Sequence, residues 1–430
     1  MMKGQRTIIV CAVLLLFGAG CARRAHQETA NKQQLASVMQ PVRISAENKD
    51  AAEPAMAAAR DRSAYIAWIE HGANKEADVF VAHLDAEGRT KSAPVRVNPN
   101  AGEAKGWRGD PPTIAVAPDK TVYVGWTARA PGGGHGTTLY LSASRDEGRT
   151  FDAPVKVNDD ERPASHAMHS LAVAADNRVY MAWLDERNVA PAMEQMPGMN
   201  QKTMEHKEPN SEVFFAASKD GGRTFSPNRR LAGEICPCCK TALLAAPDNR
   251  VYVSWRQVLP GDYRHIAVAA SMDGGESFAP SKIVSDDDWK ITGCPVSGPA
   301  LVLAGDNALR VAWYTAGERG SAGLYWAESR DNGQTFSERR ALASGQVRGN
   351  PQLLADRQNN LFAVWESDDK EPRILSVRLG DDGAATEGTP LADSAELPAL
   401  ALAGDDILVG YIVTDGERRA IWLARARPAA

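Results

Sequence analysis

The sequence has no excess of basic charge. Its 49 Lys and Arg residues stand against 54 Asp and Glu residues among 430, and the formal charge is -5. A nucleic-acid partner needs a basic face, so this class of partner is not expected. The N-terminus also has no apolar run long enough for a mature transmembrane helix, because the run from Ile8 to Phe17 has ten residues. Cysteine is scarce, with six residues in the chain.

The N-terminal segment has the features of an export signal. Lys3 and Arg6 precede the apolar run, and Gly18-Ala19-Gly20-Cys21 follows it. This end resembles a bacterial lipoprotein box, which implies a lipid on Cys21 and a protein held at the cell envelope, in the outer membrane or on the periplasmic side. Gly18 departs from the Leu, Val or Ile that is usual at this position, so a soluble secreted protein is the alternative.

An eight-residue motif, S-x-D-x-G-x-[ST]-F, occurs four times. Its Asp carboxylate can accept backbone N–H bonds across a tight turn, while the Gly adopts a positive φ. The Ser and Thr hydroxyls can add local hydrogen bonds, and the Phe can anchor the turn to a sheet. We call these segments the box turns, and they span residues 144–151, 218–225, 271–278 and 329–336.

The box turns resemble the Asp-box, or BNR repeat, of the sialidase superfamily. In that family the motif caps the hairpin between the third and fourth strands of a β-propeller blade, and it is structural. The resemblance therefore implies an all-β propeller fold. A repeat of this kind is specific for the fold and says little about activity.

A longer repeat surrounds the box turns and can be counted seven times. In each copy an apolar strand is followed by a strand of the type D-[NK]-x-V-Y-V-x-W, a third strand, the turn and a short P-V-x-V strand. We predict a signal peptide over 1–20, a flexible tether over 21–40 and one seven-bladed β-propeller over 41–427, with six blades, as in sialidases, as the alternative. The second strands end at Trp68, Trp126, Trp183, Trp255, Trp313, Trp365 and Tyr411.

The two ends of the predicted domain are expected to meet. The segment Pro41-Val42-Arg43-Ile44-Ser45 is similar to the fourth strands that begin at Pro94 and Pro154, and the last copy of the repeat has no fourth strand of its own. The N-terminal strand should therefore complete the last blade. This closure would hide two sheet edges that otherwise invite pairing with other chains.

Four cysteines remain beyond the signal and the lipoprotein box, and they lie on one predicted face. In a four-stranded blade the loops between the second and third strands and the connections between blades emerge opposite the box turns. An even number of cysteines in an oxidising compartment indicates disulfides. A bridge from the Cys236-Pro237-Cys238-Cys239 loop to Cys294 would join adjacent blades, although three pairings are open.

The same face carries residues that suit a soft metal such as copper(I), which thiolates, thioethers and imidazoles bind. The alternative is a surface loop whose Met residues cover apolar surface, because Met is an adaptable filler. The candidate metal ligands are Cys236, Cys238, Cys239, Cys294, His166, His169, Met193, Met196, Met199, Met204 and His206.

The resemblance to sialidases also implies a set of catalytic residues. Those enzymes hold the substrate carboxylate with three Arg and use an Asp as the acid and a Tyr, activated by a Glu, as the nucleophile. Their F-R-I-P motif is not present, and the nearest string, Val42-Arg43-Ile44-Ser45, fits the fourth strand of the repeat better. Matched by face, the candidates are Arg108, Arg348 and Arg256 for the carboxylate, Asp110 as the acid and Tyr263 as the nucleophile.

Two tryptophans in loops, Trp107 and Trp289, can stack on sugar rings or bury against a neighbouring blade. Lys240 and Asn350 are further candidates for ligand binding on this face. We therefore expect a monomeric, exported propeller lipoprotein that binds a glycan opposite the box turns and touches the membrane through its lipid alone, with hydrolysis left open. The alternatives are a copper-binding or other soft-metal protein and a protein-interaction scaffold.

Overall fold

The structure is a computed structural model that describes residues 35–130, 136–189, 210–345, 347–356, 358–379 and 388–428. Apart from one short 3-10 turn, η1 (Ala73–Lys75), the regular structure of these residues consists of strands. None of them belongs to a helix that is long and apolar enough to cross a membrane. The predicted all-β class is confirmed.

The strands follow one another along the whole described chain. They are β1 (Leu35–Val38), β2 (Val42–Arg43), β3 (Asp50–Ala58), β4 (Ala64–His71), β5 (Ala77–Leu84), β6 (Val95–Arg96), β7 (Thr113–Val116), β8 (Val122–Arg129), β9 (Thr137–Ser144), β10 (Val155–Lys156), β11 (His166–Val173), β12 (Val179–Asp185), β13 (Ser211–Ser218), β14 (Arg229–Ile235), β15 (Ala242–Ala245), β16 (Val251–Leu259), β17 (Tyr263–Ser271), β18 (Lys282–Ile283), β19 (Ala300–Leu303), β20 (Leu309–Thr315), β21 (Gly323–Ser329), β22 (Arg340–Ser344), β23 (Gln352–Ala355), β24 (Leu361–Glu366), β25 (Ile374–Leu379), β26 (Thr389–Ala392), β27 (Ala395–Ala403), β28 (Asp406–Asp415) and β29 (Arg418–Pro428).

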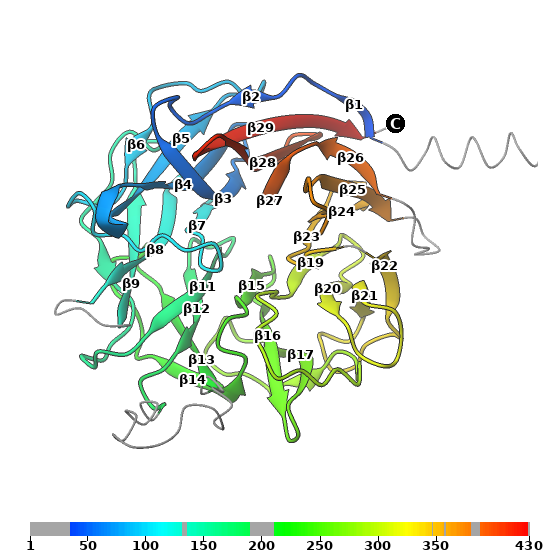
Figure 1. Ribbon diagram of the computed structural model, residues 1–430. Coiled ribbons are helices and arrows are strands. Elements are labelled where there is room, and N and C mark those ends of the chain that lie inside the picture. Colours follow the sequence, from blue (N-terminus) through cyan, green and yellow to red (C-terminus); the bar gives the residue numbers. More distant parts are fainter. Residues whose placement is uncertain are drawn as a thin grey trace, which may run out of the picture.

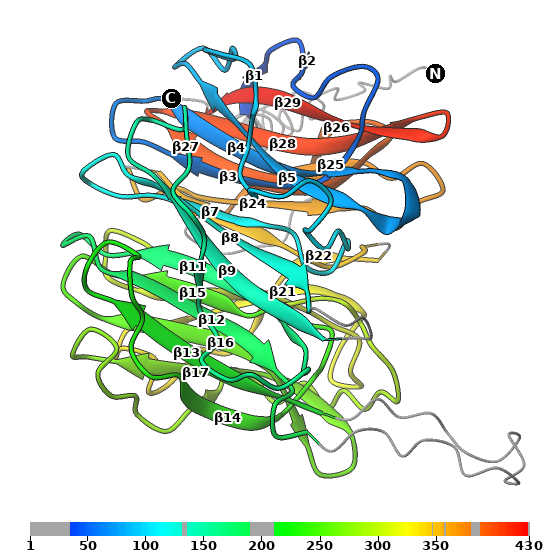
Figure 2. The ribbon, with the colours of Figure 1, turned by 90° about the vertical axis from the view of Figure 1, so that its left-hand side faces the viewer.

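Consecutive strands pair into antiparallel sheets that surround a common centre (Figure 1). Four sheets have four strands each, namely β3–β6, β7–β10, β19–β22 and β23–β26. An eight-stranded sheet contains β11–β14 and β15–β18, which are joined where Ile235 of β14 lies opposite Gln257 of β16. The last sheet contains β27, β28 and β29 with β1 and β2. Successive sheets lie face to face (Figure 2), which makes the arrangement propeller-like.

Apolar side chains fill the space between successive sheets. Trp68 of β4 is fully buried in a cluster with Leu408 and Ile412 of β28, so the first and last sheets share a core. Trp126 of β8 packs in the same way in a cluster with Val79 of β5. Truncation of such a buried aromatic side chain costs about 3–5 kcal/mol, so these contacts are a main source of stability. The buried tryptophans at the ends of second strands, as the repeat predicts, are Trp68, Trp126, Trp183, Trp255, Trp313 and Trp365.

The chain ends meet in the last sheet. Val42 and Arg43 of β2 pair antiparallel with Leu423 and Trp422 of β29, which confirms the predicted pairing of the N-terminal strand with the end of the chain. The pairing also extends further than predicted, because β1 pairs with β29 as well. Residues 35–38 are therefore part of the sheet and not of the tether expected over 21–40.

The box turns lie between the third and fourth strands of their sheets, as the resemblance implies. In the turn after β9, the Thr150 N–H donates to Asp146 Oδ1 at 2.9 Å, and the Thr150 hydroxyl donates to Asp146 Oδ2 at 2.7 Å. The Gly148 N–H donates to Ser144 Oγ at 2.8 Å. Gly148 has a φ of 83°, and a Cβ there would lie 3.2 Å from the Tyr65 ring of the preceding sheet, so both the turn and the close approach require glycine. The same bonds recur around Asp220, Asp273 and Asp331.

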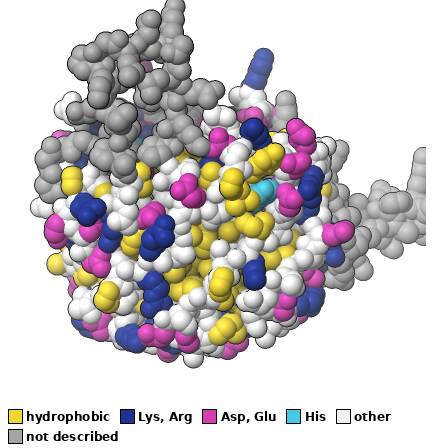
Figure 3. Space-filling model, turned by 90° about the horizontal axis from the view of Figure 1, so that it is seen from below, with side chains coloured by type: hydrophobic (Ala, Val, Ile, Leu, Met, Phe, Trp, Pro, Cys, Tyr) yellow, Lys and Arg dark blue, Asp and Glu magenta, His cyan; other side chains and the backbone are white. Residues whose placement is uncertain are grey.

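Basic and acidic side chains alternate over the side of the molecule seen in Figure 3, with apolar side chains between them. This mixture agrees with the nearly balanced composition of 49 basic and 54 acidic residues. On the described part of that side, no single sign of charge forms a continuous field of the kind that attracts nucleic acid.

The box carboxylates make stability depend on pH in acid. Hydrogen bonds from Thr150 and Thr224 lower the pKa of Asp146 and of Asp220 to about 2. Because an unfolded Asp titrates near pH ~3.9, the ionised carboxylates stabilise the folded state above that pH, and this contribution is lost as the pH falls from about 4 to about 2. We expect the urea midpoint of the wild type to fall over this interval. Asp220→Asn should lower the midpoint at pH 7 and weaken its dependence on acid pH.

A matched control is Glu417→Gln, which neutralises an exposed acid in the turn between β28 and β29. This variant should keep both the wild-type midpoint at pH 7 and its decline in acid. Equal midpoints for the wild type and Asp220→Asn across the whole pH range would show that the box hydrogen bonds do not stabilise the fold.

Candidate functional site

A cavity of about 290 Å³ lies at the centre of the arrangement. Its walls come from the first strands of the sheets, β3, β7, β11, β15, β19, β23 and β27, and from residues just before them. Arg108, Lys240 and Asn350 line it, as does Cys238. The structure therefore brings to one cavity four residues that the sequence assigned to three connections on one face.

Two of the predicted arginines meet on shared carboxylates beside this cavity. Arg108 Nη2 lies 2.6 Å from Glu366 Oε2, and Arg108 Nη1 lies 2.6 Å from Glu396 Oε2. Arg348 Nη1 lies 3.0 Å from Glu366 Oε1 and 3.8 Å from Glu396 Oε2. Because Glu366 ends a second strand and the others precede or begin first strands, all four residues come from the face opposite the box turns. We call these residues the Arg–Glu cluster.

The Arg–Glu cluster is partly open to solvent. Glu366 is 3% exposed, whereas the side chains of Arg108 and Arg348 are 35% and 40% exposed. Burial raises the pKa of Glu366, and the positive charges of Arg108 and Arg348 oppose that shift. The Leu397 N–H also donates to Glu366 Oε2 at 3.0 Å. The two carboxylates thus fix the two guanidinium groups in place while leaving part of each group accessible.

A further ion-pair chain borders the cluster, and the sequence analysis did not identify it. Arg419 Nη1 lies 3.6 Å from Glu53 Oε1, and Glu53 Oε2 lies 2.6 Å from His71 Nε2. Hydrogen bonding with Asp50 raises the pKa of Arg419 against the effect of burial. The charges of Glu53 and Glu396 act in the same direction as the hydrogen bonds. Glu366 and Glu396 were missed too, since only the folded chain shows that they face arginines far away in sequence.

Asp110 does not face the cavity as a free acid, and its catalytic role stays a prediction. It is 2% exposed and accepts hydrogen bonds from the Met168 N–H at 2.7 Å and the Thr127 hydroxyl at 3.0 Å. His169 Nδ1 lies 3.1 Å away. Burial raises the pKa of Asp110, but interaction with His169 and the charge of Lys240 outweigh it and lower the pKa overall. Asp110 therefore joins neighbouring sheets as a buried carboxylate.

Three other predicted residues are placed away from the cavity lining. Tyr263 lies on β17 with its ring 6.4 Å from that of His265, and it is not among the described residues that line the cavity. Arg256 is buried with its guanidinium 5.0 Å from the centre of the Trp289 ring. Trp289 is 5% exposed and also packs edge-on against Tyr314. Of the two tryptophans, Trp289 thus takes the buried alternative.

Trp107 remains available as a stacking surface. It is 39% exposed, and a Cβ on Gly109, which lines the cavity, would lie 2.5 Å from the Trp107 ring. Trp107 precedes Arg108 directly and is not itself a lining residue, so its exposed ring borders the cavity at Gly109. Lys240 completes the wall just before β15, and burial lowers its pKa to about 8 against the charge of Asp110.

Of the residues predicted as metal ligands, the described part of the chain brings the cysteines together but not the histidines with them. His166 Nδ1 lies 2.6 Å from the Thr137 carbonyl oxygen and its Nε2 lies 2.9 Å from Asp160, whereas His169 faces Asp110. The strand has a bulge at Met168, which has a φ of 55°, and the two imidazoles have different partners. The other predicted ligands, Met193, Met196, Met199, Met204 and His206, and the lipidation site Cys21, lie outside the described residues.

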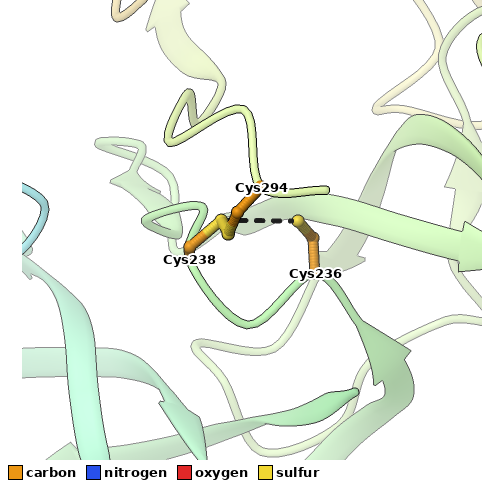
Figure 4. A group of neighbouring side chains, drawn as sticks. All are labelled: Cys236, Cys238 and Cys294. Carbon is orange, nitrogen blue, oxygen red and sulfur yellow. Dashed lines mark hydrogen bonds between the residues drawn. A yellow bond between two sulfur atoms is a disulfide. The ribbon is translucent and has the colours of Figure 1, made fainter. Parts of the chain in front are cut away.

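The four cysteines do meet. Cys238 and Cys294 form a disulfide, the bridge that the sequence analysis considered between adjacent blades. Cys236 and Cys239 are buried thiols whose sulfurs lie 3.5 Å apart. The sulfurs of Cys236, Cys238 and Cys294 lie within 4.8 Å of one another (Figure 4). Cys236 and Cys239 are spaced as a C-x2-C pair within the CPCC run.

Comparison with known proteins gives a likeness of fold. No protein-family model matches the chain, and no curated protein matches it. The BP39L lectin from Burkholderia pseudomallei is 12% identical over 89% of this chain and 97% of its own, with a TM-score of 0.58. An ulvan lyase of polysaccharide lyase family PL25 is 12% identical over 90% and 96%, with a TM-score of 0.56. The NanB sialidase from Streptococcus pneumoniae is 11% identical over 85% and 83%, with a TM-score of 0.49.

Removal of the shared carboxylate should test how far the Arg–Glu cluster stabilises the fold. Glu366→Ala leaves two guanidinium groups without their common partner. Loss of one partner of a buried pair costs about 3–5 kcal/mol, and the partial exposure of both arginines reduces this to about 1–3 kcal/mol. We expect that decrease in the free energy of unfolding, measured by urea denaturation, and a smaller one for Glu366→Gln.

The matched control is Asp368→Ala, because Asp368 pairs with the same Arg348 at 3.1 Å but is 58% exposed. Its loss should change the free energy of unfolding by at most about 0.5 kcal/mol. Equal effects of Glu366→Ala and Asp368→Ala would contradict a special contribution from the buried carboxylate.

Proposed function

We propose that this chain is an exported, seven-bladed β-propeller that binds a glycan at the central cavity, on the face opposite the box turns. The observation that carries the proposal is the partly exposed Arg108 in the cavity wall, with the exposed ring of Trp107 at the border of the cavity next to Gly109. The proposal includes an anchor on Cys21 that holds the protein at the cell envelope.

Two features support seven blades. The halves of the eight-stranded sheet, β11–β14 and β15–β18, each have the strand order of a single four-stranded sheet and meet at Ile235 and Gln257. Each apolar cluster of the described residues lies between two successive groups of strands, and the clusters return from the last group to the first. Counting β11–β14 and β15–β18 separately gives one blade for each copy of the sequence repeat.

The chemistry of the cavity suits sugar hydroxyl groups. A hydroxyl is both a donor and an acceptor, and the Arg–Glu cluster presents donors and acceptors side by side. Arg108 and Arg348 offer N–H groups, while Glu396 is 29% exposed and offers carboxylate oxygens. Asn350 adds an amide at the cavity wall.

An aromatic ring beside such a cluster adds an apolar platform for the C–H face of a sugar. Trp107 supplies this platform, since its neighbour Arg108 belongs to the cluster. Two similar solved structures are a lectin and a polysaccharide lyase bound to a sugar, which is consistent with a glycan ligand for this fold. The proposal is limited to binding because Asp110 and Tyr263, predicted as acid and nucleophile, do not line the cavity together.

Glycan-array binding tests the proposal. We expect the mature protein to retain at least one glycan, and Trp107→Ala to weaken that binding by about tenfold or more, the effect of losing a stacking contact of ~1.4 kcal/mol. Isothermal titration with the glycan found on the array would measure the loss.

The control is Met272→Ala, which removes an apolar side chain that is 56% exposed in a box turn on the opposite face. It should bind like the wild type. Binding to no glycan, or equal binding by Trp107→Ala and the wild type, would refute the proposed site.

A further inference from the structure

Four sulfur atoms lie in sequence from the surface to the interior beside the cavity. Cys294, in the connection between β18 and β19, is exposed, and its partner Cys238 is 6% exposed. Behind the disulfide, Cys236 Sγ lies 3.9 Å from Cys238 Sγ (Figure 4), and Cys239 Sγ lies 3.5 Å from Cys236 Sγ. Cys236 and Cys239 are fully buried. Each sulfur is thus close to van der Waals contact with the next.

The surroundings of the inner thiols are cationic. Arg256 is fully buried, and its Nε and Nη2 donate to the Ser297 carbonyl oxygen at 3.2 and 2.9 Å, while its Nη1 has no hydrogen-bond partner in the described structure. Arg264 is 4% exposed, and its Nε and Nη1 are likewise without a partner there. A buried cation without a counter-charge is costly, and a thiolate would supply that charge.

The two inner thiols lie side by side against the disulfide, and the charge of Arg256 acts on both of them. A thiolate formed here is stabilised by the buried cation. Thiolate attack on a neighbouring disulfide sulfur is therefore the reaction that these contacts suit.

We propose that the four cysteines form an internal dithiol–disulfide relay that moves the disulfide from Cys238–Cys294 to Cys236–Cys239 and so places thiols at the surface. In the first step, Cys236 attacks Cys238 Sγ as its thiolate. The Cys238–Cys294 bond breaks, and Cys294 leaves as a thiolate. In the second step, Cys239 gives its proton to the released Cys294 and attacks Cys236 Sγ. Cys238 then leaves as a thiolate.

Atoms, protons and electrons of the two steps balance within the chain. One disulfide bond breaks and one forms, and two electrons pass from the buried pair to the outer pair, so no external oxidant is needed. The result is an exposed Cys294 thiol that can reduce a disulfide of another molecule. This relay does not depend on the proposed glycan binding.

Trapping with a maleimide tests the relay in the folded protein. The chain is fully reduced, and one equivalent of diamide then restores one disulfide and leaves two thiols. N-ethylmaleimide is added without denaturant, and peptide mass spectrometry follows the modified cysteines and the remaining bridge with time. We expect a slow phase in which Cys294 becomes alkylated while the Cys236–Cys239 bridge accumulates.

Two variants separate the steps. Cys236→Ser removes the attacking thiol, so the slow phase of Cys294 alkylation should be lost, at least about tenfold in rate. Cys239→Ser keeps the first step and removes the second, so alkylated Cys294 should accompany a Cys236–Cys238 bridge.

Circular dichroism and the thermal midpoint check that both variants are folded. If Cys236→Ser is unfolded, the bridge found in Cys239→Ser is by itself the test of the relay. The relay is overturned if Cys294 stays bridged to Cys238 in every wild-type chain, if folded Cys236→Ser is alkylated at Cys294 as fast as the wild type, or if Cys239→Ser forms no Cys236–Cys238 bridge.

Discussion

Apolar contact between neighbouring sheets is the constraint on which the rest of the molecule depends. A four-stranded sheet of this sequence is apolar on both faces, so it must be covered twice, and a ring in which each sheet covers the next satisfies this need for every sheet. Trp68 shows the closing step, since it packs with Leu408 and Ile412 of the last sheet. The ring fixes the positions at which the first strand of each repeat begins. Residues at these positions line the cavity.

The buried and half-buried arginines on this framework have two different surroundings. Arg108 and Arg348 share Glu366 and Glu396, so their charge is balanced and their remaining N–H groups can bind neutral hydroxyls. Arg256 donates to the carbonyl oxygens of Ser297 and Tyr314, and its charge acts on the buried thiols of Cys236 and Cys239. Counter-charge, and not the residue type, therefore distinguishes the two surroundings.

The sequence was sufficient where structure depends on local pattern and repetition. The box turns and the spacing of Trp68, Trp126 and their equivalents predicted strands, turns and the pairing of residues 41–45 with the end of the chain. Side-chain partners were not accessible in this way, because they depend on contacts between distant parts of the chain. Arg108 reaches Glu366 across 258 positions. The different partners of His166 and His169, Thr137 and Asp110, belong to other strands and loops, and no local pattern predicts them.

The cavity proposed to bind a glycan and the proposed sulfur relay share one short segment. Cys238 and Lys240 line the cavity, while Cys236 and Cys239 of the same run form the buried thiol pair. Cys239 is adjacent to both Cys238 and Lys240 in the chain, so a change of bridge from Cys238 to Cys239 must be accommodated in the wall of the cavity. A ligand that contacts this wall and binds one bridging state more tightly shifts the disulfide equilibrium toward that state. The bridging state changes the affinity for the ligand by the same free energy. The single loop Cys236–Lys240 is the physical element through which such linkage acts.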